Sequence, residues 1–261
     1  MKHLRTIGKT ICLAFSMYSR IPMPYLQYDE EDMRYTFLCF PFVGVMIGVL
    51  EYFWFVFATG IALTQGFYAA VATVIPIFVT GGFHMDGYID TMDALSSHRE
   101  RERKLEILKD SHVGAFAVIW SIVYFLLSYG AWQEANHMDK MVIVVVCCSF
   151  VLSRITSGLA AIILPSATGK HSLTSFAKAG DRKVVKVGLL CYMIAILVTL
   201  FVWEWRYGLV VLITLGMIVW YYAQMAKKQF GGITGDLAGW YLQMCELCIL
   251  LITVVFTTLF S

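Results

Sequence analysis

Three aspartates follow one another at helical spacing soon after a long apolar stretch. Asp90 and Asp93 follow Asp86 by four and seven residues. A helix of about 3.6 residues per turn places all three within an arc of about 60° on one face. Carboxylates this close disfavour one another's charge unless a cation lies between them. Oxygen-only ligands are typical of hard cations such as Mg²⁺, Mn²⁺ or Ca²⁺. The spacing therefore predicts a metal site, and Asp90 and Asp93 are the candidate catalytic carboxylates within it.

The residues between these aspartates indicate that the acidic face belongs to a packed helix. They are apolar or small, among them Tyr88 and Met92, and the apolar Leu95 follows the last aspartate, so the other faces of the helix are suited to burial. Acidic groups at membrane depth are costly and usually functional. The alternative is a solvated acidic face that pairs with nearby arginines. His84 also has two interpretations, as a proton acceptor in catalysis or as a hydrogen-bonded structural residue.

A glycine pair precedes this acidic face, and a second pair recurs near the C-terminus. Residues 81–86 read GGFHMD and residues 231–236 read GGITGD, so each pair is followed by an aspartate at the same distance. Glycine lets the backbone approach a ligand closely. Three of these glycines are expected beside substrate phosphates: Gly81, Gly82 and Gly232. The repetition also predicts that Asp236 faces the same cation or diphosphate as Asp86.

Further candidates lie outside these two segments. The expected phosphate-binding side chains are Arg20, Lys109, Ser111 and Arg154. Asp110 is a further candidate metal ligand. Glu246 follows Asp236 by ten residues, about 15 Å along one helix, so it is expected in a deeper pocket. Arg154 is its expected partner, either as a structural ion pair or in a catalytic role.

The rest of the chain predicts that membrane helices position these residues. Of the 261 residues, 59% are hydrophobic and only 15% are charged, against about 25% charged in a typical soluble domain. A helix of about 20 apolar residues crosses a bilayer. Seven segments qualify: 37–63, 66–82, 113–132, 141–165, 187–203, 207–225 and 237–260. A large soluble core is excluded, because too little polar sequence remains to cover it.

The N-terminal residues predict one more helix of a different kind. Residues 4–20 form an amphipathic or re-entrant segment that ends before Pro22, since proline disfavours helix in the residue that precedes it. No soluble domain is apparent. We therefore expect an all-α, polytopic membrane bundle of about seven transmembrane helices plus this segment, with residues 1–261 forming a single membrane-embedded catalytic domain.

Basic residues concentrate in every second connection. Stretches 1–36, 83–112, 166–186 and 226–236 hold 17 of the 20 Lys and Arg residues. Because cytoplasmic loops are enriched in Lys and Arg, the N-terminus and the acidic face are predicted to be cytoplasmic. The net charge of +2 gives no reason to expect a nucleic-acid partner. Membrane lipid is an expected partner, and the sequence leaves homo-oligomer formation open.

Two stretches of the chain carry a family motif: residues 81–95, GGFHMDGYIDTMDAL, and residues 101–118, RERKLEILKDSHVGAFAV. They resemble the central motif of the cobalamin synthases, or adenosylcobinamide-GDP ribazoletransferases. The stretches SRIPMP, FPFVGVMIG, LSRITSGLAA and GGITGDLAG extend the resemblance over nearly the whole chain. Two positions depart from the family: His112 stands where arginine is common, and Ala94 stands where glycine is common. Neither departure removes a carboxylate.

The resemblance implies a reaction, a cofactor and a location. A member of this family is a transferase that joins α-ribazole, or α-ribazole 5′-phosphate, to adenosylcobinamide-GDP. The products are adenosylcobalamin, or its 5′-phosphate, and GMP, in the final assembly of the nucleotide loop of cobalamin. The implied cofactor is Mg²⁺, and the implied location is the bacterial cytoplasmic (inner) membrane. The residues alone leave two alternatives open: another Mg²⁺-dependent membrane phosphotransferase, and a cation transporter with acidic groups accessible from both faces.

Overall fold

The structure, a computed structural model, describes residues 2–27, 33, 35–110, 112–167 and 182–260. Within these residues the chain forms helices joined by turns, with one isolated bridge between Ser166 and Ile233, so the all-α prediction is confirmed. The elements are α1 (Lys2–Tyr18), α3 (Thr36–Gly60), α4 (Gln65–Thr80), α5 (Phe83–Ser96), α6 (Arg101–Ile107), α7 (Ala115–Ala135), α8 (Lys140–Ile163), α10 (Arg182–Trp203), α11 (Trp205–Met225), η1 (Ala226–Phe230) and α12 (Gly235–Phe260).

Six helical segments are long and apolar enough to cross a membrane: α3, α7, α8, α10, α11 continued by η1, and α12. Each coincides with a predicted segment to within five residues at either end. The remaining predicted segment, 66–82, corresponds to α4, and counting α4 with α5 as one span gives the seven that were predicted. Here α4 and α5 pass the same test only as a pair, and the chain bends by 99° between them. The bend lies at Gly81 and Gly82, whose φ angles of 70° and 82° fall in the left-handed region that glycine adopts without steric cost.

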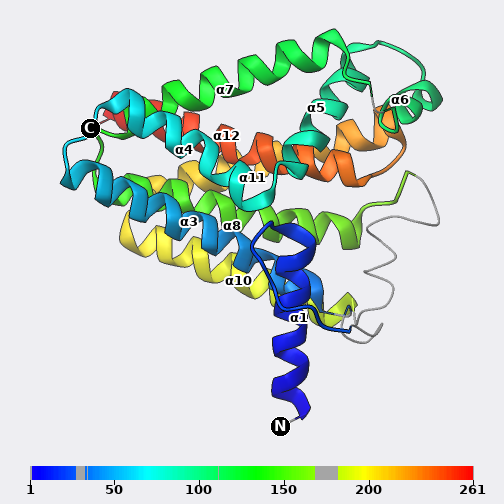
Figure 1. The fold of residues 1–261 in the computed structure, drawn as a ribbon, viewed down its shortest axis with the longest axis horizontal. Coiled ribbons are helices and arrows are strands. Elements are labelled where there is room, and N and C mark those ends of the chain that lie inside the picture. Colours follow the sequence, from blue (N-terminus) through cyan, green and yellow to red (C-terminus); the bar gives the residue numbers. More distant parts are fainter. Residues whose placement is uncertain (1, 28–32, 34, 111, 168–181, 261) are drawn as a thin grey trace.

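The long helices lie roughly side by side, and α5 and α6 lie at one end of the bundle, far from the C-terminus (Figure 1). The most buried of these helices is α8 and the least buried is α10. Glycines let α3 approach α8 closely. A Cβ at Gly44 would overlap the Phe150 carbonyl oxygen, and one at Gly48 would lie 3.1 Å from the Cys147 carbonyl oxygen. Small residues at such contacts are typical of membrane helices.

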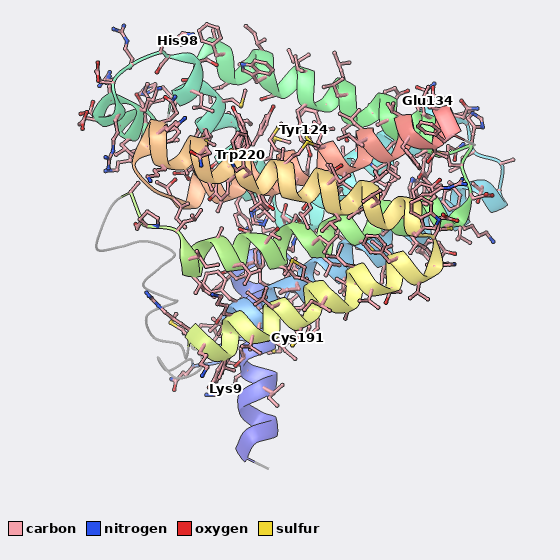
Figure 2. All side chains as sticks on the ribbon, turned by 180° about the vertical axis from the view of Figure 1, so that it is seen from behind. Lys9, His98, Tyr124, Glu134, Cys191 and Trp220 are labelled. Atoms are coloured by element: carbon pink, nitrogen blue, oxygen red, sulfur yellow. The ribbon has the colours of Figure 1, made fainter. Side chains whose placement is uncertain are left out.

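Large apolar side chains cover much of the outside of the bundle. Exposed examples come from several of the long helices: Phe53, Phe78, Leu126, Ile194, Val202 and Trp220. The polar residues His98 and Glu134 lie at opposite ends of the molecule (Figure 2). An exposed apolar surface of this extent is suited to contact with lipid, and the chain is accordingly a multi-pass membrane protein.

The helix expected from residues 4–20 is α1, which stands across the long helices rather than along them (Figure 1). Its second half is anchored, because Phe15 and Tyr18 are buried in the core of the bundle. The chain that leaves α1 is then fixed to the end of α4, since the Arg20 backbone N–H donates to the Val79 carbonyl at 2.8 Å. Arg20 is thereby held beside the bend between α4 and α5.

Candidate active site

The two Gly-Gly-x-x-x-Asp segments meet where α5 crosses the start of α12. A Cβ added to Gly87 would lie 2.7 Å from the Asp236 carbonyl oxygen, and one added to Gly239 would lie 2.8 Å from the His84 carbonyl oxygen. Only glycine at both positions lets the two helices come this close. The two segments therefore lie together, and a cation or diphosphate shared by Asp86 and Asp236 stays a prediction.

Side-chain hydrogen bonds hold α5 at this crossing. From α12, Trp240 Nε1 donates to Met92 Sδ at 3.1 Å. From α7, Trp120 Nε1 donates to Ser96 Oγ at 3.2 Å. The Tyr88 hydroxyl of α5 in turn donates to the Trp120 carbonyl at 3.3 Å. Contacts with two neighbouring helices therefore fix the direction in which the acidic face of α5 points.

Four carboxylates gather at the crossing and are called here the carboxylate cluster: Asp86, Asp90, Asp93 and Asp236. Asp90 is partly buried and interacts electrostatically with the other three. Asp93 reaches the start of α7, where a Cβ at Gly114 would overlap its carboxylate. Because like charges in a partly buried site disfavour one another, the cluster is suited to a positively charged ligand.

The cluster is not a closed metal cage. Among the residues that the structure describes, no three His, Cys, Asp or Glu side chains are arranged to hold one metal ion. The donors of the cluster are nevertheless all carboxylate oxygens, and Mg²⁺ is usually held by one or two carboxylates together with water and substrate phosphates. The cluster therefore fits Mg²⁺ shared with a phosphate ligand better than it fits zinc, which prefers His and Cys.

The turn between α6 and α7 carries three further predicted residues, Lys109, Asp110 and Ser111. The Asp110 Oδ1 atom accepts a hydrogen bond from the His112 backbone N–H at 3.0 Å and lies 2.6 Å from His112 Nδ1. These hydrogen bonds from His112 lower the pKa of Asp110. Lys109 is exposed, and Ser111 lies outside the described residues. Asp110 is thus paired with His112 at the surface, and its role as a metal ligand stays a prediction.

An arginine covers each of the two glycine turns. The side chain of Arg20 lies over Gly81, and the guanidinium group of Arg101 lies over Gly231, so that a Cβ at either glycine would overlap the arginine. Arg20 was expected near phosphate, but Arg101 was not singled out. It lies in the charge-alternating run RERERK, which is typical of a solvated helix face. The apolar pattern gave no signal for Arg101, because α6 contains only Leu105 and Ile107, two residues apart.

Gly232 makes a contact between two parts of the chain. The Ile233 backbone N–H donates to the Pro165 carbonyl at 2.9 Å, and the Ala167 N–H donates to the Ile233 carbonyl at 3.0 Å. A Cβ at Gly232 would lie 2.5 Å from the Pro165 carbonyl oxygen. The close approach that this glycine allows is therefore used by residues 165–167, and a phosphate contact at Gly232 stays a prediction.

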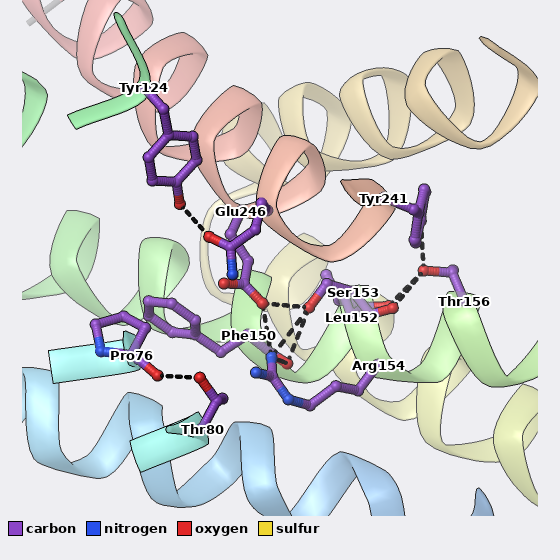
Figure 3. Close-up of polar contacts among 11 residues, drawn as sticks. Pro76, Thr80, Tyr124, Phe150, Leu152, Ser153, Arg154, Thr156, Tyr241 and Glu246 are labelled. Atoms are coloured by element: carbon purple, nitrogen blue, oxygen red, sulfur yellow. Dashed lines mark hydrogen bonds and ion pairs between the residues drawn. The ribbon is translucent and has the colours of Figure 1, made fainter. Parts of the chain in front are cut away.

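Deeper in the bundle, Arg154 of α8 and Glu246 of α12 form an ion pair (Figure 3). The Arg154 Nη1 atom lies 2.6 Å from Glu246 Oε1. The same carboxylate oxygen accepts a hydrogen bond from Ser153 Oγ at 2.8 Å, and Arg154 Nη1 also donates to the Phe150 carbonyl at 2.6 Å. Both charged side chains are buried. The predicted pairing is confirmed, whereas a contact of either residue with substrate stays a prediction.

Other polar groups are buried in the middle of the bundle. Glu51 is fully buried, and neither of its carboxylate oxygens has a hydrogen-bond partner in the described part of the chain. The same holds for the Thr73 and Ser149 hydroxyls and for His84 Nε2. A cavity of about 20 Å³ is lined by Thr73, Ser149 and Glu246 among other residues, which is room for one water molecule. The proton-acceptor role considered for His84 stays a prediction.

These features define a polytopic, all-helical membrane protein with an acidic site at one end of its bundle. Residues 10–254 match the family model described as cobalamin-5-phosphate synthase. The match covers most of the chain, and the protein belongs to this family.

Similar proteins from several bacteria carry one name, adenosylcobinamide-GDP ribazoletransferase. The relative from Lachnoclostridium phytofermentans is 38% identical over 238 residues, which are 91% of this chain and 90% of the relative. A relative from Clostridium perfringens is 34% identical over 246 residues, 93% of this chain and 96% of its own length. The relative from Brevibacillus brevis is 33% identical over 255 residues, 92% and 96% of the two chains. No solved structure matches the chain.

Proposed function

We propose that this chain catalyses the reaction for which its relatives are named. It joins α-ribazole, or α-ribazole 5′-phosphate, to adenosylcobinamide-GDP and releases GMP, which completes the nucleotide loop of cobalamin. The observation that carries the proposal is the crossing of α5 and α12. This crossing unites two acidic segments, both of which resemble motifs of the family, in one carboxylate cluster.

The reaction is a phosphoryl transfer. A ribose hydroxyl of the riboside other than the 5′-hydroxyl, which is phosphorylated in α-ribazole 5′-phosphate, attacks the phosphorus that is linked to cobinamide. A new O–P bond forms, and the bond between that phosphorus and the departing GMP breaks. Such a reaction needs little covalent chemistry from the protein, because positioning and charge neutralisation dominate. Asp90 or Asp93 accepts the proton of the attacking hydroxyl, since a positioned carboxylate is a suitable general base.

Mg²⁺ is the cofactor that the donor set favours. The residues that would hold it are the carboxylate cluster, with Asp110 as a further candidate. When bound, Mg²⁺ neutralises charge on the phosphate oxygens. The open arrangement of the cluster supports this assignment, because part of the coordination of Mg²⁺ then comes from the diphosphate of the substrate.

The acidic site is assigned to the cytoplasmic side of the bacterial inner membrane. The sequence that contains α5 and α6 is rich in Arg and Lys, as cytoplasmic connections are, and a nucleotide-linked substrate is available on that side. The exposed apolar surface of the long helices is the expected site of lipid contact. The proposal is independent of whether the protein forms homo-oligomers.

Release of GMP by the purified, detergent-solubilised protein tests the function. We expect GMP to form from adenosylcobinamide-GDP only when α-ribazole or its phosphate is present, with the cobalamin product identified by mass. EDTA should abolish the reaction, and added Mg²⁺ should restore it. A protein that releases no GMP under these conditions, or releases it equally fast without α-ribazole, would contradict the proposal.

A further inference from the structure

We propose that Arg101 binds phosphate on the α12 side of the carboxylate cluster, opposite Arg20 on the α5 side. The ligand is the diphosphate of the nucleotide-linked substrate, so the inference rests on the function proposed above. It assigns a substrate-binding role to a residue outside the expected site and makes the short helix α6 part of the binding surface.

The two arginines occupy equivalent places. Arg20 lies over Gly81 and Arg101 lies over Gly231, and both glycines have left-handed backbone with φ of 70° and 76°. Each turn leads into a helix whose first turn carries an aspartate of the cluster, Asp86 in α5 and Asp236 in α12. Each of the two turns that lead into the cluster therefore carries one arginine side chain.

Neither arginine is committed to another partner. In the described part of the chain, neither Arg20 nor Arg101 forms an ion pair or a side-chain hydrogen bond. Both residues are exposed. Arg103, which lies in α6 together with Arg101, is paired instead, since it donates to Glu106 Oε2 at 2.6 Å. A guanidinium group has five N–H donors in a planar fork that suits phosphate oxygens, and these donors are available on Arg20 and Arg101.

The position of Arg101 is built into the fold. Lys104, one turn farther along α6, is buried and donates to Gln229 Oε1 of η1 at 2.5 Å. This bond fixes α6 against the segment that ends at Gly231. The absence of a side chain on Gly231 leaves the space that the Arg101 guanidinium occupies. Lys104 and Gly231 thus fix the Arg101 guanidinium over the turn that leads into α12.

Steady-state kinetics of Arg101→Gln test this role. We expect the KM for adenosylcobinamide-GDP to rise about ten- to a hundredfold, as the loss of a hydrogen-bonded charge implies, while the KM for α-ribazole is unchanged. Inhibition by GMP should weaken in parallel. Arg101→Lys keeps the positive charge but not the planar set of N–H donors, so its KM for adenosylcobinamide-GDP should lie between those of the unmodified protein and Arg101→Gln. Arg103→Gln, on the same helix but paired with Glu106, is the matched control and should resemble the unmodified protein.

Three results would overturn the assignment to the diphosphate. Arg101→Gln could show the same KM for adenosylcobinamide-GDP as Arg103→Gln. Only the KM for α-ribazole 5′-phosphate could rise, which would place Arg101 at the other substrate. A lower thermal unfolding midpoint with equal changes in all KM values would indicate a structural role. Failure of the proposed function is distinguishable, because the unmodified protein itself would then release no GMP.

Discussion

At the scale of single residues, the central position of Asp90 within the carboxylate cluster decides its importance. Its charge interacts with those of Asp86, Asp93 and Asp236, so a cation bound in the cluster is attracted to it directly. We expect Asp90→Asn to lower GMP release at least tenfold at saturating Mg²⁺, a loss of about 1.4 kcal/mol in transition-state stabilisation. The measurement is the rate for the purified variant.

The matched control for this substitution is Asp139→Asn. Asp139 is exposed and precedes α8, and its side chain makes no capping hydrogen bond. Removing its charge should leave both activity and thermal unfolding unchanged. If Asp90→Asn kept more than about a tenth of the activity, the cluster would not be the metal site.

The Arg154–Glu246 pair leads to a prediction about stability. Removing one partner leaves the other charge buried without compensation, which costs about 3–5 kcal/mol. Glu246→Leu and Arg154→Met should each lower the thermal unfolding midpoint in detergent, and the double change Arg154→Met with Glu246→Leu should recover much of the loss. Equal, additive losses in the double variant would show that the two side chains do not stabilise each other.

At the scale of helices, the contact between α5 and α12 depends on two glycines. A Cβ at Gly87 would lie 2.7 Å from the Asp236 carbonyl oxygen, whereas ordinary contacts begin at 3.4 Å. Gly87→Ala must therefore push the helices apart by several tenths of an ångström. Because misplacement on the order of 1 Å costs on the order of a hundredfold in rate, we expect a large loss of GMP release from a protein that still inserts into the membrane.

Gly130→Ala in α7 is the control for this prediction. Nothing lies within 4 Å of the position where its Cβ would stand, and alanine is favoured over glycine inside a helix by about 1 kcal/mol. This variant should be fully active and at least as stable as the unmodified protein. Full activity of Gly87→Ala would show that the close crossing is not needed for catalysis.

The sequence predicts the helices better than the connections between them. Apolar length alone located the long helices, and the repeated Gly-Gly-x-x-x-Asp pattern predicted that Asp86 and Asp236 meet. The 99° bend after α4 was not predicted, because a glycine pair permits many backbone directions. Arg101 was missed for a different reason: its position depends on Lys104, Gln229 and Gly231, residues that only the folded chain brings together.

At the scale of the whole molecule, the distribution of basic residues predicts the orientation in the membrane. His98 and Glu134 lie at opposite ends of the bundle, so the connections that contain them should face opposite compartments. In a variant whose seven cysteines are replaced, a cysteine at Glu102 should react with an impermeant thiol reagent only after cells are permeabilised. A cysteine at His137 should react in intact cells. The reverse labelling pattern would place the carboxylate cluster away from cytoplasmic nucleotides.

The crossing of α5 and α12 also determines when the site comes into being during synthesis. The chain between Ser96 at the end of α5 and Gly235 at the start of α12 contains most of the membrane helices. At about 5–20 residues per second, the ribosome delivers α12 roughly 7–28 seconds after α5. During this interval the face of α5 that carries Gly87 is not covered by α12. The carboxylate cluster then lacks Asp236. A chain interrupted anywhere before α12 therefore enters the membrane without a complete site, so substrate is consumed only by molecules whose synthesis has run almost to the end.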